Sequence, residues 1–278
     1  MRINTNISAL NTHRMMGITH RESGKNLEKL SSGKRLNRSS DDAAGLAISE
    51  KMQAQIKGLR MASKNSLDGM SLIQTAEGAL NEVHAMLQRM RELAVQAAND
   101  TNQPEDRKAM KDEIDQLKGE IERIGENTEF NKIKMFAGSA GTNAPVKVVI
   151  QNGANENQMF EIQFDKLMTV SGVSSLQTMA VDNSGNANTA ISTLDTAINK
   201  VSDIRSMLGA YQNRLEKAIA NLDNTAENLT AAQSRIADTD MALEMSEFTK
   251  LNIMQQAGTA MLAQANQQPQ MLLKLLNA

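Results

Sequence analysis

The sequence predicts a mainly α-helical protein, a long antiparallel helical bundle or coiled coil with a small β-hairpin region. Apolar residues return every three or four positions over stretches much longer than an ordinary helix. Two such stretches, 52–97 and 191–236, have equal lengths and flank a short segment in which apolar residues alternate. Aromatic residues make up only 2% of the chain and Trp is absent, which suits a thin bundle better than a wide globular core.

Residues 1–42 are expected to form an N-terminal helix and a connector. The apolar members of its stripe are Ile3, Ile7, Leu10, Leu27 and Leu30. The following "SSGKRLNRSS" is rich in Ser, Gly and Asn, which interrupt a helix. Asp41 or Asp42 then suits the N-cap of a helix that begins near Ala43.

Residues 43–130 are expected to form the first part of a helical rod. A helix over 43–97 contains Gly58, Gly69 and Gly78, each costing about 1 kcal/mol relative to Ala, so packing must hold it. The segment "NDTNQPED" breaks this helix, and Pro104 suits the first turn of the next one. The second helix carries apolar residues at heptad spacing: Met110, Ile114, Leu117, Ile121 and Ile124.

Residues 131–188 are expected to hold a β-hairpin followed by an irregular segment from 165. Alternation places Val146, Val148 and Ile150 on one face of the first strand, and Phe160, Ile162 and Phe164 on one face of the second. The turn-forming "QNGANENQ" separates them. Residues 189–237 then form the C-terminal helix of the rod, antiparallel to the stretch 52–97.

Residues 238–278 are expected to form a C-terminal helix whose stripe must be covered. Its apolar members are Leu251, Met254, Met261, Ala265, Leu272 and Leu275. We expect the N-terminal helix to cover part of this stripe. Because both stripes are narrow, a pair of them still has an uncovered side, and we expect copies of the same chain to cover it. These residues and the N-terminal stripe are therefore the candidate self-assembly residues.

Composition argues against several other classes of protein. The net charge of −2 supplies no general field for nucleic acid, and there is no apolar run long enough for membrane insertion or a cleaved secretory signal. The absence of Cys excludes disulfides and cysteine-based metal sites. His13, His20 and His84 lack the context of a metal motif, and no phosphate-binding loop or nucleophile motif is present. We therefore expect no enzymatic activity, no metal and no cofactor.

Several motifs resemble the signatures of bacterial flagellins. They include "MRINTNISALN", "LSSGKRLNRSSDDAAGLAISEKM", "ENLTAAQSRIADTDMALEMSEFTK" and "AMLAQANQQP". The resemblance implies a short flagellin without large outer domains, whose paired terminal helices line the inner tube of the flagellar filament. It also implies swimming motility, an extracellular location reached without a cleaved signal peptide, and an export chaperone, cap and junction proteins as partners.

The resemblance further implies recognition by Toll-like receptor 5, at positions that match Arg89, Leu93 and Glu113 in this chain. Spacing places Arg89 and Leu93 together beside the inward stripe of their helix, which predicts that Leu93 is exposed apolar surface. Two alternatives to a filament subunit stay open. One is a protein of the hook–filament junction, and the other is a cytoplasmic signalling coiled coil.

Overall fold

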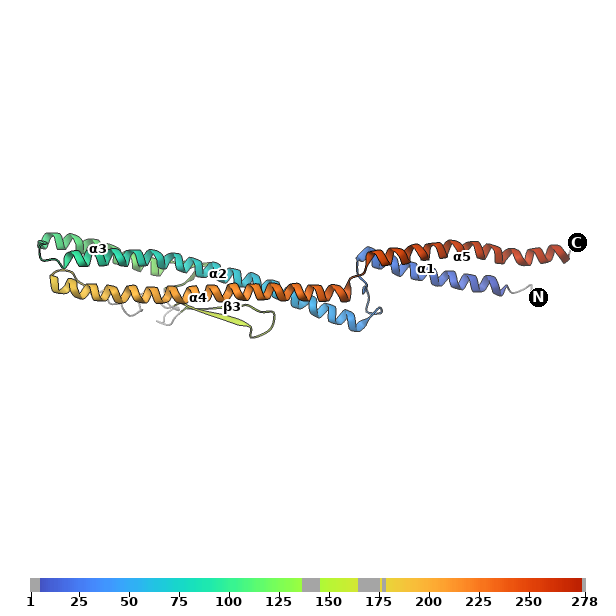
Figure 1. The fold of residues 1–278 in the computed structure, drawn as a ribbon, viewed down its shortest axis with the longest axis horizontal. Helices are drawn as coiled ribbons and strands as arrows, with labels where there is room; N and C mark the ends of the chain where they lie inside the picture. The colour runs from blue at the N-terminus through green and yellow to red at the C-terminus, as the bar shows by residue number, and fades with distance from the viewer. Residues whose placement is uncertain (1–5, 137–145, 165–175, 177–178, 277–278) are drawn as a thin grey trace. The chain divides into compact units, whose positions relative to one another are not determined.

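The computed structural model describes residues 6–136, 146–164, 176 and 179–276, with side chains of the last helix described up to residue 267. Its helices are α1 (Ile7–Ser32), α2 (Ala43–Ala97), α3 (Pro104–Asn127), α4 (Ser184–Ala237) and α5 (Met241–Leu276) (Figure 1). The described strands form two antiparallel pairs: β1 (Glu129–Phe130) with β2 (Ile133–Lys134), and β3 (Val146–Gln151) with β4 (Met159–Phe164). The predicted fold class, mainly α with a small β-hairpin region, is confirmed.

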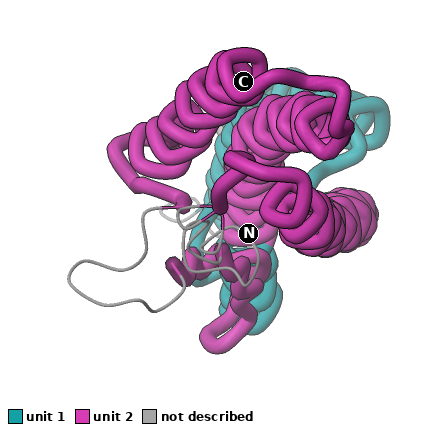
Figure 2. Tube along the Cα trace, turned by 90° about the vertical axis from the view of Figure 1, so that its left-hand side faces the viewer, with its two compact units in different colours: residues 1–55, 227–278 teal, residues 56–226 magenta. Residues whose placement is uncertain are grey.

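The chain divides into two compact units, shown in different colours in Figure 2. Unit 1 combines residues 1–55 with residues 227–278, and so contains both terminal helices. Unit 2 consists of residues 56–226. Unit 1 therefore depends on segments from the two ends of the chain meeting, whereas unit 2 is one continuous stretch.

Unit 2 is an antiparallel arrangement of α2, α3 and α4. Arg91 Nε donates to Asp195 Oδ1 at 2.6 Å, and Gln212 Nε2 donates to Glu77 Oε2 at 3.1 Å. Residue numbers thus rise along α2 in the direction in which they fall along α4. The two helices are therefore antiparallel, as the two stripes of equal length predicted. The largest fully buried side chains are Ile73, Leu80, Leu87, Met90, Ile114, Ile121, Met135, Phe136, Ile162, Phe164 and Leu194. Each such side chain contributes about 1.5–3 kcal/mol, which gives this unit a core of its own.

The β3–β4 hairpin packs on α2 through two glycines of that helix. Its cross-strand partners include Val148 with Ile162 and Ile150 with Phe160, so the predicted apolar face is confirmed. A Cβ added at Gly69 would collide with Ile150 Cδ1, and one added at Gly58 would lie 3.0 Å from Ala154 Cβ. These two glycines therefore let the hairpin approach the helix closely.

Side chains cap the helices at the positions where their sequences change character. Asp42 Oδ1 accepts from the backbone N–H groups of Ala44 and Gly45, both at 3.0 Å, so the N-cap of α2 is Asp42. Pro104 begins α3 as predicted. α4 begins at Ser184, inside the segment expected to be irregular, because Asn183 Oδ1 accepts from the N–H of Asn186 at 2.7 Å. The rest of that expectation falls mainly on residues outside the described ranges.

Candidate assembly surface on the terminal helices

The helices α1 and α5 lie side by side and antiparallel in unit 1 (Figure 1). Asn6 Nδ2 donates to the Ala265 carbonyl at 2.8 Å, and Gln255 Nε2 lies 3.2 Å from His20 Nδ1. At the other end of the pair, Lys29 Nζ lies 3.2 Å from Glu244 Oε1. The N-terminal helix therefore covers one side of the C-terminal helix, as the sequence predicted.

The contact between these helices is a narrow seam of heptad positions. On both helices the side chains at these positions are partly or fully buried: Ala9, Thr12, Met16, Thr19, Ser23, Asn26 and Leu30 of α1, and Glu244, Phe248, Leu251, Gln255, Gly258, Leu262 and Ala265 of α5. Most of these residues are small or polar. Because small and polar side chains bury little apolar area, the pair is held more weakly than an ordinary leucine-rich coiled coil.

Four side chains close one end of the seam, and we call them the polar latch: Asn26, Lys29, Thr239 and Glu244. Asn26 and Glu244 are 7% and 9% exposed. In the amide orientation that satisfies both of its polar atoms, Asn26 Nδ2 donates to Glu244 Oε1 at 2.8 Å. Thr239 Oγ1 donates to Glu244 Oε2 at 3.3 Å. The buried carboxylate is thus shared by three donors, since Lys29 also reaches it.

Next to the latch, backbone hydrogen bonds join the segment between α1 and α2 to the segment between α4 and α5. Arg35 N–H donates to the Ala237 carbonyl at 2.7 Å, and Thr239 N–H donates to the Gly33 carbonyl at 3.1 Å. Arg35 Nη2 also donates to the Ile236 carbonyl at 2.8 Å, which satisfies the C-terminal end of α4. Gly33 has φ 68°, a left-handed conformation that ends α1.

Asp41 organises the connector rather than capping α2. Its carboxylate Oδ2 accepts from the backbone N–H groups of Arg38 at 3.0 Å and Asn37 at 3.3 Å. The hydrogen bond from Arg38, followed by that from Asn37, lowers the pKa of the Asp41 carboxyl below its ordinary value.

The predicted self-assembly residues divide between covered and uncovered positions. Leu30, Leu251 and Ala265 lie in the seam. The uncovered ones, all exposed, are Ile7, Leu10, Leu27, Met254 and Met261. Ile3 and the side chains of Leu272 and Leu275 lie outside the described residues. The C-terminal stripe is therefore not one contact face, because a single partner helix covers only one flank of it.

Further large apolar side chains are uncovered on the same two helices. They are Met15 of α1 and Met241, Leu243, Met245 and Ile253 of α5. Ten large apolar side chains are thus exposed on the described parts of this helix pair, and such a concentration favours association with other molecules. The uncovered faces of α1 and α5 are thus the candidate assembly surface.

In unit 2, Arg89 and Glu113 lie together while Leu93 is covered. Arg89 Nε donates to Glu113 Oε1 at 2.9 Å, and this bond, followed by that to Glu92, raises the pKa of the Arg89 guanidinium. Leu93 is only 2% exposed, so the prediction that it is surface was wrong. Because α3 packs on the flank of α2 that carries Arg89, Leu93 is buried one turn further along that flank, although Arg89 itself is half exposed.

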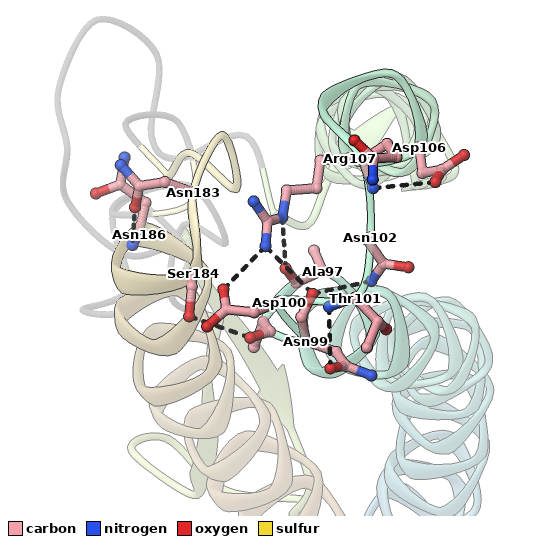
Figure 3. A network of polar contacts seen from close by, with 12 residues as sticks. Ala97, Asn99, Asp100, Thr101, Asn102, Asp106, Arg107, Asn183, Ser184 and Asn186 are labelled. Carbon is pink, nitrogen blue, oxygen red and sulfur yellow. Dashed lines mark hydrogen bonds and ion pairs between the residues drawn. The ribbon is translucent and has the colours of Figure 1, made fainter.

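The turn between α2 and α3 is held by Arg107, a role that the sequence pattern did not predict (Figure 3). Its Nε donates to the Ala97 carbonyl at 3.1 Å, and its Nη2 donates to the Asn99 carbonyl and to Asp100 Oδ1, both at 3.2 Å. Ser184 Oγ donates to the Ala98 carbonyl at 3.1 Å. Side chains from α3 and α4 thus satisfy carbonyls that the end of α2 leaves free.

The polar latch was also missed, although its signal was present. Asn26 precedes Leu30 by four positions and Glu244 precedes Leu251 by seven, so both polar residues stand at the spacing of the apolar stripe.

Across the described ranges, no group of three or more His, Asp or Glu side chains could hold a metal ion. None of the helices, as far as they are described, is long and apolar enough to cross a membrane.

Comparison with known proteins shows the family to which this chain, with its paired terminal helices, belongs. The bacterial flagellin N-terminal helical region matches residues 3–141, and the bacterial flagellin C-terminal helical region matches residues 191–276. This chain belongs to the bacterial flagellin family. The flagellin of Halalkalibacterium halodurans is 55% identical over 276 residues, which cover 99% of this chain and 100% of the relative. The flagellin of Bacillus subtilis is 50% identical over 303 residues, with the same two coverages.

Two solved structures share the fold. The crystal structure of Bacillus cereus flagellin has a TM-score of 0.51 and 32% identity, and the match covers 61% of this chain and 94% of that one. A putative flagellar hook-associated protein from Vibrio parahaemolyticus has a TM-score of 0.61 with coverages of 71% and 100%. At 12% identity it supports the fold alone. The chain is a short flagellin without a large outer domain, as the resemblance implied.

Proposed function

We propose that this chain polymerises into the extracellular flagellar filament through the uncovered faces of α1 and α5, and so serves swimming motility. Two relatives, from Treponema maltophilum and Treponema phagedenis, are named as flagellar filament core proteins. The observation that carries the proposal is the large apolar side chains left uncovered on the paired terminal helices. Family membership favours this function over a signalling coiled coil, and the names of the relatives favour it over a junction protein.

The geometry supports contacts on two different sides of the helix pair. Met254 and Met261 belong to the same stripe as Leu251 and Ala265. Because α1 covers Leu251 and Ala265 and leaves the two methionines exposed, a helix of another copy could pack on them and extend the seam. At about 100° per residue, Leu10 lies roughly opposite the seam positions of α1. Two unlike faces on one subunit favour head-to-tail contacts, which produce an open polymer rather than a closed dimer.

The test is to place charges on the uncovered part of the α5 stripe. Met254→Asp with Met261→Asp should abolish filaments, because an unpaired buried charge costs several kcal/mol. The monomer should keep its melting temperature, since both side chains are exposed. As a control, Gln116→Asp with Asn127→Asp adds the same two charges at exposed positions of α3 and should leave filaments intact. Normal filaments from the α5 variant, seen by negative stain, would refute the proposal.

We also propose that an export chaperone covers this apolar surface before assembly. An uncovered apolar face favours aggregation in the free subunit, so a protein that shields it would keep the subunit competent. Cap and junction proteins of the flagellum would then contact the same face at the filament ends. Chaperone binding should weaken at least about tenfold in Met254→Asp with Met261→Asp, measured by calorimetry.

Recognition by Toll-like receptor 5 is a separate proposal that rests on Arg89 and Glu113. These two side chains are 52% and 45% exposed and form one charged patch across α2 and α3. Arg89→Ala should reduce receptor activation in a reporter-cell dose response without changing the melting temperature. Wild-type potency of this variant would remove the assignment.

A further inference from the structure

Half of the large apolar side chains that are exposed on the described parts of the terminal helices are methionines. The chain has 19 methionines. In the part of the chain that the structure describes, the methionines with large exposed fractions gather on these helices: Met15, Met241, Met245, Met254 and Met261. Two others, Met61 and Met159, are equally exposed but belong to unit 2. By contrast, Met90 and Met135 are fully buried.

A thioether and a branched aliphatic side chain bury similar apolar area but differ in chemistry. The flexible thioether adapts its shape to a partner surface. It also reacts with peroxides, because exposed sulfur lone pairs accept an oxygen atom. Met254 and Met261 are 41% and 61% exposed, so both are accessible to solvent in the single chain.

We propose that Met254 and Met261 are oxidation sites through which hydrogen peroxide blocks polymerisation of the free subunit, and that methionine sulfoxide reductases reverse the block. This inference rests on the proposed assembly surface. In the reaction, one oxygen atom of the peroxide transfers to the thioether sulfur. The peroxide O–O bond breaks, an S–O bond forms, the sulfur loses two electrons and the second oxygen leaves as water.

The product changes the side chain at the point where a partner must dock. A sulfoxide is polar and carries a strong hydrogen-bond acceptor, whereas the seam that a partner would extend is built on buried apolar side chains such as Leu251 and Ala265. Burying that acceptor without a donor is unfavourable. We therefore expect the critical concentration for polymerisation to rise about tenfold or more.

Assembly should also protect the two sulfurs. If another copy packs on this flank, Met254 and Met261 become covered in the filament and lose access to peroxide. The free subunit is then the sensitive state, and a finished filament is the resistant one. Met16, which faces Gly258 inside the seam, gives an internal comparison because it is already partly covered in the single chain.

The experiment treats full-length monomer and filament with hydrogen peroxide and measures sulfoxide at each methionine by peptide mass spectrometry. In the monomer, Met254 and Met261 should oxidise at rates close to those of Met61 and Met159, and much faster than Met90 and Met135. In the filament, oxidation of Met254 and Met261 should slow at least about tenfold. Equal rates for these two residues in monomer and filament would overturn the proposal.

The functional arm compares three treated monomers. After peroxide treatment, wild type and the control variant Met61→Leu with Met159→Leu should no longer polymerise. Purified methionine sulfoxide reductases should restore polymerisation in both. Met254→Leu with Met261→Leu should polymerise after treatment as well as before it, since leucine keeps the apolar area and lacks sulfur. Loss of polymerisation by this variant equal to that of treated wild type would refute the assignment of these sites.

The design separates this inference from the assembly surface itself. The untreated aspartate variant at the same two positions tests whether the flank is used at all. If that variant polymerises normally, the assembly surface is wrong. If it fails while oxidised wild type polymerises normally, only the oxidation sites are wrong.

Discussion

Lys29 Nζ lies 3.2 Å from Glu244 Oε1, and this ion pair joins the last turn of α1 to the first turn of α5. Glu244→Ala would remove the acceptor shared by Lys29, Asn26 and Thr239. Because Asn26 is buried, leaving its amide without that partner should destabilise the helix pair by about 1–3 kcal/mol. Amide hydrogen exchange in α1 and the first turns of α5 should accelerate accordingly.

Glu247→Ala is the matched control for this change. Glu247 lies one turn further along α5 and pairs with Lys250 at 3.5 Å, where both side chains are exposed. Its removal should cost less than about 1 kcal/mol. Similar exchange rates in the two variants would show that the polar latch does not stabilise the helix pair.

The glycines of α2 should respond in opposite ways to substitution by alanine. A Cβ added at Gly78 meets no atom from another part of the described chain within 4 Å, so Gly78→Ala should stabilise the monomer by about 0.5–1 kcal/mol, because alanine suits a helix better than glycine. Gly69→Ala collides with Ile150 and should destabilise unit 2 by about 1–3 kcal/mol. Chemical denaturation of both variants gives the comparison. A stabilising Gly69→Ala would mean that the hairpin does not press on the helix at this point.

Leu93 should behave as a core residue. Leu93→Ala leaves a cavity and should lower the stability of unit 2 by about 2–5 kcal/mol. Arg89→Ala, one turn away on the surface, should cost less than about 1 kcal/mol. Any loss of receptor activation in Leu93→Ala should therefore track the unfolded fraction, measured by circular dichroism at the assay temperature. A fully folded Leu93→Ala variant with reduced activation would point instead to direct receptor contact.

Arg107 should be the most sensitive charged residue of the α2–α3 turn. Its side chain is only 15% exposed and donates to two carbonyls at the end of α2. Arg107→Ala should cost about 1–3 kcal/mol because the Ala97 carbonyl loses this donor and the Asn99 carbonyl keeps only its hydrogen bonds from Asn102. Arg123→Ala, which removes an exposed pair within α3, is the control and should cost less than about 1 kcal/mol. Equal melting temperatures for the two variants would contradict the capping role.

The long helices and the hairpin could be predicted because their signals are local and repeated. The stripe through Leu80, Leu87 and Ala94 fixes which face of α2 is buried, and the alternation in Val146–Ile150 fixes the inner face of β3. The β1–β2 pair was not predicted, since its turn depends on Asn131 and Lys132 at φ 49° and 65°. Residues other than glycine seldom adopt that conformation.

The candidate site was predicted less fully than the fold. Apolar spacing identified the stripe of α5 but could not tell which flank α1 covers, because both flanks look alike in one chain. The packing of α1 buries Leu251 and Ala265 and leaves Met254 and Met261 exposed, a difference that their spacing in the sequence does not contain. The burial of Leu93 was missed for a related reason, since a helix with two neighbours buries a wider arc than one stripe.

The polar latch also bears on how the terminal helices choose their alignment. Away from the latch, many seam positions of both helices carry small or polar side chains, such as Thr12, Thr19 and Ser23 of α1 and Gln255 and Gly258 of α5, so sliding one helix by a heptad would exchange similar contacts. Such a slip would, however, separate Asn26 and Lys29 from Glu244 and leave buried polar groups without partners. Four residues at one end thus give a nearly uniform pair of helices a single register, much as one buried asparagine does in a coiled coil.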